Sequence, residues 1–241
     1  MTFSICFWIL FGVALLCCAV GFYKYVYFIS IGYGAAVSGQ GIAMLWMFRD
    51  RLNALVVLLC ILLVFYGCRL SGYLLIREIK SASYKKHMKT EIKDGSSMKF
   101  FVKVMMWIFC GLLYVVMVSP VFYRIENADI HMDPACMIGV VLMVCGLILE
   151  SAADISKNQQ KKINPRRFCD KGLFRFVRCP NYLGEMIIWT GVFVSGVSSF
   201  CSAGQWIVAI IGYVGIIYVM FSGWKSGRIK TMAAIRNIRL M

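Results

Sequence analysis

Residues 53–76 read NALVVLLCILLVFYGCRLSGYLLI, an apolar run in which Arg69 is the only charged residue. An α-helix needs about 20 predominantly apolar residues to cross the hydrocarbon core of a bilayer. This run meets that requirement, and six other stretches of the chain are similar in length and character. We therefore expect an all-α integral membrane protein with about seven transmembrane helices, spanning roughly residues 3–22, 26–48, 53–76, 101–123, 134–153, 184–200 and 203–223.

The composition excludes a soluble fold. Of the 241 residues, 61% are apolar and only 15% are charged, and the mean hydropathy is +0.76. Soluble domains average about 45–50% apolar and about 25% charged residues. We treat residues 1–241 as one multi-pass membrane domain. The stretch 26–48 is the weakest of the seven, because several small and polar residues dilute it.

The distribution of Lys and Arg predicts the orientation. With seven spans, 21 of the 26 basic residues fall on the side of the C-terminus, and 3 fall on the other side. The positive-inside rule then places the N-terminus outside and the C-terminus in the cytoplasm. The net charge of +15 therefore reports topology, and no nucleic-acid partner is expected. The host membrane, endoplasmic reticulum or bacterial inner membrane, stays open, as does the oligomeric state.

No metal site is expected. The chain has 11 Cys but only two His, and it has no C-x-x-C motif or Cys/His cluster. Most of the cysteines lie within the apolar stretches, where a free Cys behaves as a small buried hydrophobe. Neither a zinc site nor a disulfide framework is indicated.

The third stretch carries polar residues at intervals of three, four and four positions: Tyr66, Arg69, Tyr73 and Arg77. This spacing places them on one face of a helix. Ionisable residues at membrane depth are costly and usually mark a site. The deeper pair, Tyr66 and Arg69, favours binding of a carbonyl or a phosphate. The shallower pair also fits simple anchoring at the cytoplasmic interface.

Two further clusters lie towards the cytoplasmic side. Glu150 and Asp154 are four residues apart at the end of the fifth stretch, and their carboxylates could accept hydrogen bonds from ribose hydroxyls or an amide. Offsetting the nearby lysines is the alternative role. Further on, Arg167, Asn181 and Glu185 lie in a basic and apolar segment around Pro180, where a helix N-terminus attracts anions. A phosphate-bearing cofactor fits that setting, although Glu185 also suits simple helix capping.

Residues 172–191, GLFRFVRCPNYLGEMIIWTG, resemble the signature of the steroid 5-alpha-reductase C-terminal domain family and its microbial relatives. Weaker similarity extends to YGCRLSGYLL at 66–75 and to the segment 150–162, and 150–223 is the most recognisable region. The resemblance implies a membrane reductase that uses NADPH from the cytoplasmic side to reduce a carbon–carbon double bond in a lipidic or sterol-like substrate. It implies cofactor contacts for Arg69, Asp154, Arg167 and Asn181, with Glu185 supporting the pocket.

The resemblance also implies that Tyr66 donates a hydrogen bond to the substrate carbonyl. The chain departs from the family at two places. The second stretch lacks the Glu that pairs with the catalytic Tyr, and Gln40 is the comparable group there, so we include it as a candidate catalytic residue. The C-terminal tail lacks acidic and aromatic residues, and Arg228 is the candidate substitute for a cofactor-binding Arg.

Two rival functions remain open. Isoprenylcysteine carboxyl methyltransferases carry a similar tract and bind S-adenosylmethionine there, but this chain has Cys179 and Asn181 at mismatched positions and no acid in its tail. The third possibility is a non-catalytic membrane protein that retains the fold for lipid binding or assembly. In all three cases the expected partners are membrane lipid or a hydrophobic small molecule.

Overall fold

The computed structural model describes residues 4–80, 98–127, 133–164, 169 and 171–239. All the regular secondary structure in these residues is helical, which confirms the expected all-α fold. The eight α-helices among them are α1 Ile5–Cys18, α2 Ile31–Met47, α3 Ala54–Lys80, α5 Phe100–Asn127, α6 Pro134–Ile163, α7 Leu173–Phe176, α8 Pro180–Gly196 and α9 Ala203–Arg239.

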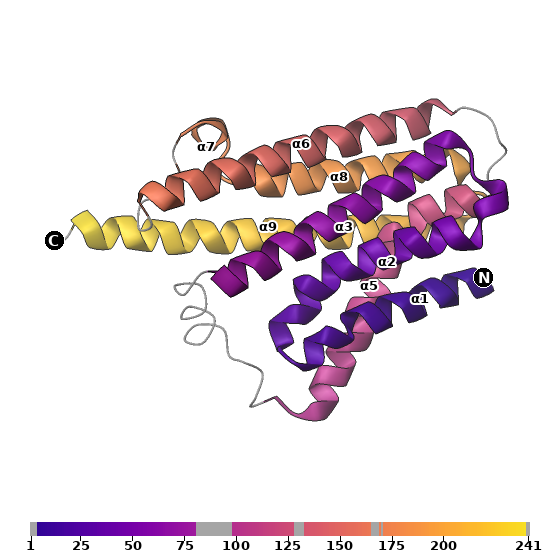
Figure 1. Ribbon diagram of the computed structural model, residues 1–241, viewed down its shortest axis with the longest axis horizontal. Coiled ribbons are helices and arrows are strands. Elements are labelled where there is room, and N and C mark those ends of the chain that lie inside the picture. Colours follow the sequence, from indigo (N-terminus) through magenta and orange to yellow (C-terminus); the bar gives the residue numbers. More distant parts are fainter. Residues whose placement is uncertain (1–3, 81–97, 128–132, 165–168, 170, 240–241) are drawn as a thin grey trace.

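Seven of these helices are long, and Figure 1 shows them running in alternating directions along one axis, with the chain termini at opposite ends. Within the part of the chain that the structure describes, five stretches are long and apolar enough to cross a membrane: Ile5–Phe22, Ala54–Ile79, Phe100–Asn127, Pro134–Ile163 and Ala203–Phe221. The protein is therefore an integral multi-pass membrane protein.

The other two long helices, α2 and α8, have 17 residues each. At 1.5 Å per residue they are roughly 25 Å long, somewhat short of the hydrocarbon thickness of about 30 Å. Short 3-10 turns extend both of them, Tyr25–Ile29 before α2 and Val197–Ser199 after α8. The helix predicted over 26–48 is thus interrupted, because Ser30 adopts a non-helical backbone with φ −123° and ψ −91°.

Local sequence signals explain where two helices begin. Asp133 precedes α6 and accepts a hydrogen bond from the backbone N–H of Ala135 at 3.1 Å, and Pro134 occupies the first helical position. Pro180 opens α8 in the same way. Proline suits this position because its missing N–H would have no partner inside the helix. The sixth predicted stretch, 184–200, therefore begins four residues earlier than expected.

Close backbone contact joins α6 to α8. A Cβ atom added at Gly184 would lie 2.8 Å from the backbone nitrogen of Glu150, and one at Gly191 would lie 2.6 Å from the carbonyl oxygen of Gly139. Only glycine allows such an approach, which is common where membrane helices pack. This contact sets the position of α8 along the axis of α6 and places Glu185 close to Glu150.

A similar contact joins α2 to α3. A Cβ atom at Gly67 would lie 2.2 Å from the carbonyl oxygen of Gly34, and the Ser38 hydroxyl donates to the carbonyl of Val64 at 3.0 Å. The small and polar residues that weaken the hydropathy of the second stretch are therefore its packing surface. They place Tyr33 of α2 beside Tyr66 of α3.

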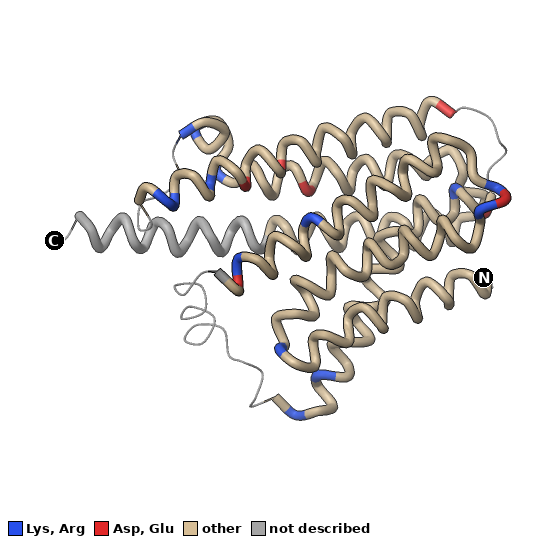
Figure 2. The backbone as a smooth tube through the Cα atoms, viewed as in Figure 1, with Lys and Arg blue, Asp and Glu red and all other residues tan. Residues whose placement is uncertain are grey.

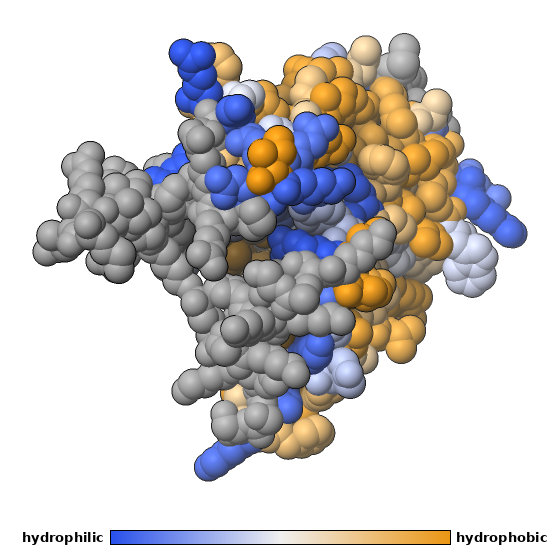
Figure 3. Space-filling model, turned by 60° about the vertical axis from the view of Figure 1, so that its left-hand side comes forward, coloured by the Kyte–Doolittle hydropathy of each residue, from blue (hydrophilic) through white to orange (hydrophobic). Residues whose placement is uncertain are grey.

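The surface agrees with a membrane environment. Figure 2 shows the charged residues gathered towards the ends of the helices, with only a few between them. Large apolar side chains remain exposed along the helices, including Trp46 at 75% and Ile148 at 65%. In Figure 3 the hydrophilic residues lie on the end turned forward, while the flank beside them is mostly hydrophobic. Lipid covers such a flank at little cost.

Candidate functional site

Tyr66 lies at the centre of a buried polar cluster. Its side chain is fully buried on α3, and its hydroxyl donates a hydrogen bond to Glu185 Oε1 of α8 at 2.6 Å. Glu185 is itself only 6% exposed. The structure thus pairs two residues that the sequence assigned to separate roles, the substrate carbonyl for Tyr66 and the cofactor pocket for Glu185.

Tyr33 is a third member of this cluster, and the sequence analysis did not identify it. Its hydroxyl lies 2.9 Å from the Tyr66 hydroxyl and donates to Glu185 Oε1 at 3.0 Å. The indole N–H of Trp189 donates to the Tyr33 hydroxyl at 2.8 Å. A tyrosine between two glycines in a small-residue helix was the available signal, because such a helix packs closely and buries its larger side chains.

Arg69 forms the second part of the site, one helical turn from Tyr66. Its guanidinium pairs with Glu150 and also with Asp154 Oδ2, the latter at 3.0 Å. Glu150 and Asp154 both project from α6 and are 3% and 9% exposed. The spacing of four residues had predicted that these carboxylates share a face, and the structure shows that they share one guanidinium.

Three buried atoms of this second part have no hydrogen-bond partner: the donors Arg69 Nε and Nη2 and the acceptor Glu150 Oε2. Of these, Nη2 is in ion-pair contact with Glu150 Oε1. Buried polar atoms are normally paired. An unpaired donor on Arg69 and an unpaired acceptor on its ion-pair partner Glu150 are the kind of groups that a polar ligand such as a carboxamide or a ribose would satisfy.

The polar face of α3 continues towards its end. The Tyr73 hydroxyl donates to Asn158 Oδ1 of α6 at 3.0 Å, and the Arg77 guanidinium lies 5.8 Å from the centre of the Tyr73 ring. The predicted stripe of two phenols and two guanidiniums is therefore one face of α3. This face runs from the buried Tyr66 to Tyr73 and Arg77, and Tyr73 contacts the exposed Asn158 of α6.

Of the remaining predicted residues, Asn181 lies about one turn before Glu185 on α8, Gln40 faces another helix, and two lie outside the described residues. Asn181 lies half-buried in the first turn of α8. Gln40 is fully buried, and its Nε2 donates to the carbonyl of Leu10 at 3.4 Å, so its amide faces α1. Arg167, and the side chain of Arg228 in α9, lie outside the described residues.

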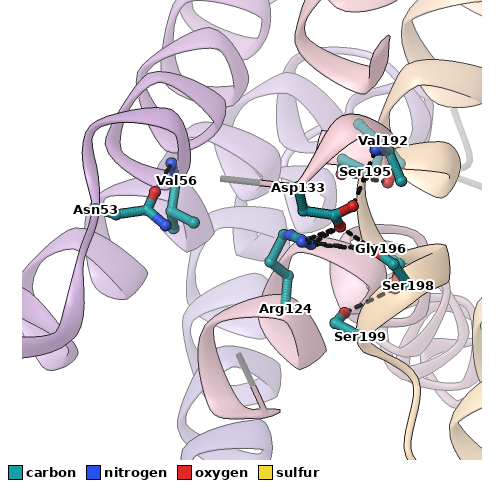
Figure 4. Close-up of polar contacts among 10 residues, drawn as sticks. Asn53, Val56, Arg124, Asp133, Val192, Ser195, Gly196, Ser198 and Ser199 are labelled. Atoms are coloured by element: carbon teal, nitrogen blue, oxygen red, sulfur yellow. Dashed lines mark hydrogen bonds and ion pairs between the residues drawn. The ribbon is translucent and has the colours of Figure 1, made fainter. Parts of the chain in front are cut away.

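A separate ionic cluster lies at the opposite end of the bundle, where α5 ends and α6 begins (Figure 4). Arg124 of α5 donates to Asp133 Oδ2 at 2.6 Å and to the Ser198 hydroxyl at 3.3 Å. Burial of Asp133 acts most strongly and favours its neutral form, but the hydrogen bonds from Ser198 and Ala135 and the charge of Arg124 outweigh it. They hold the pKa of Asp133 below its usual value. This cluster fastens α5, α6 and the end of α8.

A partly buried ion pair lies at the other end of the bundle. Lys24, between α1 and α2, contacts Glu78 of α3, and this hydrogen bond raises the pKa of Lys24 above its usual value. Among the residues that the structure describes, no three His, Cys, Asp or Glu side chains are grouped so that they could hold a metal ion.

One family matches this chain. It is described as Protein of unknown function (DUF1295), and it matches residues 21–232. Because the match covers most of the chain, including every described residue of the site, the protein belongs to this family. Comparisons with curated proteins and with solved structures found no match. The family description names no activity, so the function has to be argued from the side chains.

Proposed function

We propose that this member of the DUF1295 family is a membrane-embedded, NADPH-dependent reductase. Its substrate would be lipidic or sterol-like, with a carbon–carbon double bond conjugated to a carbonyl. The observation that carries the proposal is the fully buried Tyr66 hydroxyl, hydrogen-bonded to Glu185 and one helical turn from the ion-paired Arg69. The sequence resemblance at residues 172–191 points to the same class of reaction.

The described residues fit the cofactor. Arg69 carries an unpaired N–H one turn after Tyr66 on α3, and its ion-pair partner Glu150 carries an unpaired oxygen. Asn181 lies in the first turn of α8, where backbone N–H groups favour anions. Arg69 and Asn181 would hold phosphate or amide oxygens, and Glu150 and Asp154 would accept hydrogen bonds from ribose hydroxyls or the nicotinamide amide.

When bound, NADPH supplies a hydride to the β-carbon of the substrate. The carbonyl oxygen of the substrate then gains negative charge, and the Tyr66 hydroxyl would stabilise that charge by hydrogen bonding. A single donor at such an oxygen is worth about 10²–10³ in rate. The interaction is stronger in a buried site than in water, because the surroundings are less polar.

We also propose that α2 and α8 complete a bundle of seven spans, with the N-terminus outside and the C-terminus in the cytoplasm. The alternating helix directions and the 3-10 turns that extend α2 and α8 support it. The end of the polar α3 face at Tyr73 and Arg77 would then lie at the cytoplasmic side, which is the compartment that supplies NADPH.

Ligand-induced stabilisation tests the proposal. A ligand that binds only the folded state at 100 times its Kd stabilises a protein by about 2.7 kcal/mol. We expect NADPH to raise the unfolding temperature of the purified protein and S-adenosylmethionine to leave it unchanged. Stabilisation by S-adenosylmethionine alone would favour a methyltransferase, and no response to either ligand would favour a non-catalytic protein.

A pair of asparagine variants sharpens the test. Asn181→Ala should abolish the NADPH shift, because it removes a cofactor contact. Asn53→Ala is the matched control, since Asn53 caps α3 by accepting from the backbone N–H of Val56 at 2.9 Å, away from the proposed site. The control should lose about 1 kcal/mol of stability and keep the full NADPH shift. If NADPH raises the unfolding temperature of both variants equally, Asn181 does not contact the cofactor.

A further inference from the structure

Three oxygen atoms in the core form a closed triangle. The distances are 2.6 Å between Tyr66 and Glu185 Oε1, 3.0 Å between Tyr33 and Glu185 Oε1, and 2.9 Å between the two hydroxyls. All three lie within the range of O–H···O hydrogen bonds. Trp189 donates to the Tyr33 oxygen from outside the triangle at 2.8 Å, so it supplies no proton to the three contacts.

Counting protons decides the charge of Glu185. An ionised carboxylate accepts but does not donate, so the two phenols would supply two protons for three contacts. Both phenols would then donate to Oε1, and two hydroxyl oxygens would face each other at 2.9 Å with no proton between them. If Oε1 carries a proton, Glu185 donates to Tyr66 instead of accepting from it, Tyr66 donates to Tyr33, and Tyr33 donates to Oε1, so each oxygen donates once and accepts once.

The surrounding charges lead to the same result. Among the described side chains, one guanidinium interacts with Glu185, that of Arg69, and it pairs with Glu150 and Asp154. A third buried carboxylate would have no cation of its own, and a buried carboxyl group in that position takes up a proton instead. The described titratable groups that interact with Glu185 are Tyr33, Tyr66, Arg69, Tyr114, Glu150, Asp154 and Tyr182.

We propose that Glu185 is held protonated in the resting protein and closes a three-proton ring with Tyr33 and Tyr66. Tyr33 and Glu185 are then positioning residues, because they orient the Tyr66 hydroxyl and restore its proton. The chemical role of this ring rests on the proposed function, but its protonation state does not.

In the proposed reaction the ring accounts for the proton that reduction consumes. Once the β-carbon has accepted the hydride, Tyr66 gives its proton to the resulting enolate oxygen, and an enol forms. The Glu185 proton moves to the Tyr66 oxygen, which leaves Glu185 as a carboxylate. The enol rearranges to the ketone, and Glu185 regains a proton from water, so that one proton is taken up in each turnover.

Infrared spectroscopy of the purified full-length protein in nanodiscs tests the ring without any ligand. A protonated carboxylic acid has a carbonyl stretch that is distinct from the carboxylate bands and shifts in heavy water. We expect this band in the wild-type protein, its loss in Glu185→Gln, and its retention in Glu126→Gln, which is the control on α5 because Glu126 acts on Tyr123 and not on the ring. Tyr33→Phe should keep the band but shift it, because one hydrogen bond to the acid is lost.

Two results would overturn the inference: no such band in the wild-type protein, or a band that Glu185→Gln leaves unchanged. If Glu185→Gln does not fold, Tyr33→Phe decides, and an unshifted band would exclude the ring. These spectra need no NADPH. Failure of the ring is therefore distinguishable from failure of the reductase proposal, which depends on NADPH-induced stabilisation.

Discussion

Arg69 illustrates the cost of ionic groups inside the bundle. Its guanidinium contacts Glu150 and Asp154 from the neighbouring helix, and its side chain is 15% exposed. Removing one partner of a buried ion pair is expensive because the other charge stays buried without compensation. The guanidinium of Arg69 is therefore a cation that both of these acids on α6 contact.

We predict that Arg69→Gln lowers the free energy of unfolding by about 3–5 kcal/mol, because two buried carboxylates lose their cation. Thermal or urea unfolding in detergent measures this change. The double variant Arg69→Gln/Glu150→Gln should recover most of the loss, since it removes the deeper of the two acids. A double variant no more stable than the single one would contradict this role of Arg69.

At this scale the sequence predicted single faces but not the contacts between them. The intervals of Tyr66, Arg69 and Tyr73 place them on one helix face, and this prediction is confirmed. The partnership of Tyr66 with Glu185 joins residues 119 positions apart, and no local pattern encodes it. In the second stretch the sequence indicated Gln40 as the partner of Tyr66. In the structure the partners are Tyr33 of that helix and the carboxyl group of Glu185 on α8.

At the scale of helices, the α6–α8 contact determines where Glu185 lies. A Cβ atom at Gly191 would meet the carbonyl oxygen of Gly139 at 2.6 Å, and backbone cannot move aside as a side chain can. A larger residue there must push the two helices apart, and Glu185, two turns earlier on α8, moves with them.

We predict that Gly191→Val destabilises the protein by more than 2 kcal/mol, as over-packing in a well-packed core costs about 1–3 kcal/mol or more. It should also abolish the infrared band assigned to Glu185. Gly72→Ala on α3 is the control, because a Cβ atom there has nothing within 4 Å. It should be neutral or stabilising by up to about 1 kcal/mol, through helix propensity. Equal unfolding temperatures for both variants would argue against the contact.

The helix ends contribute a pH-dependent part of the stability. The pKa of Asp133 is lowered in the folded protein by Ser198, Ala135 and Arg124, against the opposing effect of burial. A lowered pKa stabilises the fold above the usual aspartate pKa of about 3.9, and this stabilisation disappears as the pH falls through the folded value.

We therefore predict that acidification below about pH 4 destabilises the wild-type protein more than Asp133→Asn, which has no proton to gain at this position. Unfolding curves at pH 6 and pH 3 measure the difference between the two proteins. Parallel losses in both would show that the Arg124–Asp133 cluster contributes little to the pH dependence.

The helix boundaries show which parts of the fold were predictable. Apolar runs predicted the seven long helices, because length and hydropathy are local properties of the chain. They did not predict that α6 continues to Ile163 through a polar segment, or that the second stretch is interrupted at Ser30. Hydropathy reports the solvent around a helix, whereas helix ends depend on backbone hydrogen bonding.

For the whole molecule, the charge distribution predicts the orientation. A fluorescent reporter that folds only in the cytoplasm should be active when fused after Met241 and inactive when fused after Arg51. An extracytoplasmic enzyme reporter should give the reverse pattern. Activity of the cytoplasmic reporter at both positions would contradict seven spans, because it would place both ends of the 52–241 segment on the same side.

Transfer of deuterium tests the central claim most directly. The purified protein is incubated with NADPH deuterated at the nicotinamide C4 position and with lipids extracted from its host membrane, and the products are analysed by mass spectrometry. The wild-type protein should place deuterium on carbon in a lipid that has lost one double bond. Tyr66→Phe should do so about 10²–10³ times more slowly while still binding NADPH. Binding of NADPH without deuterium in any lipid, or equal transfer by both proteins, would contradict the account.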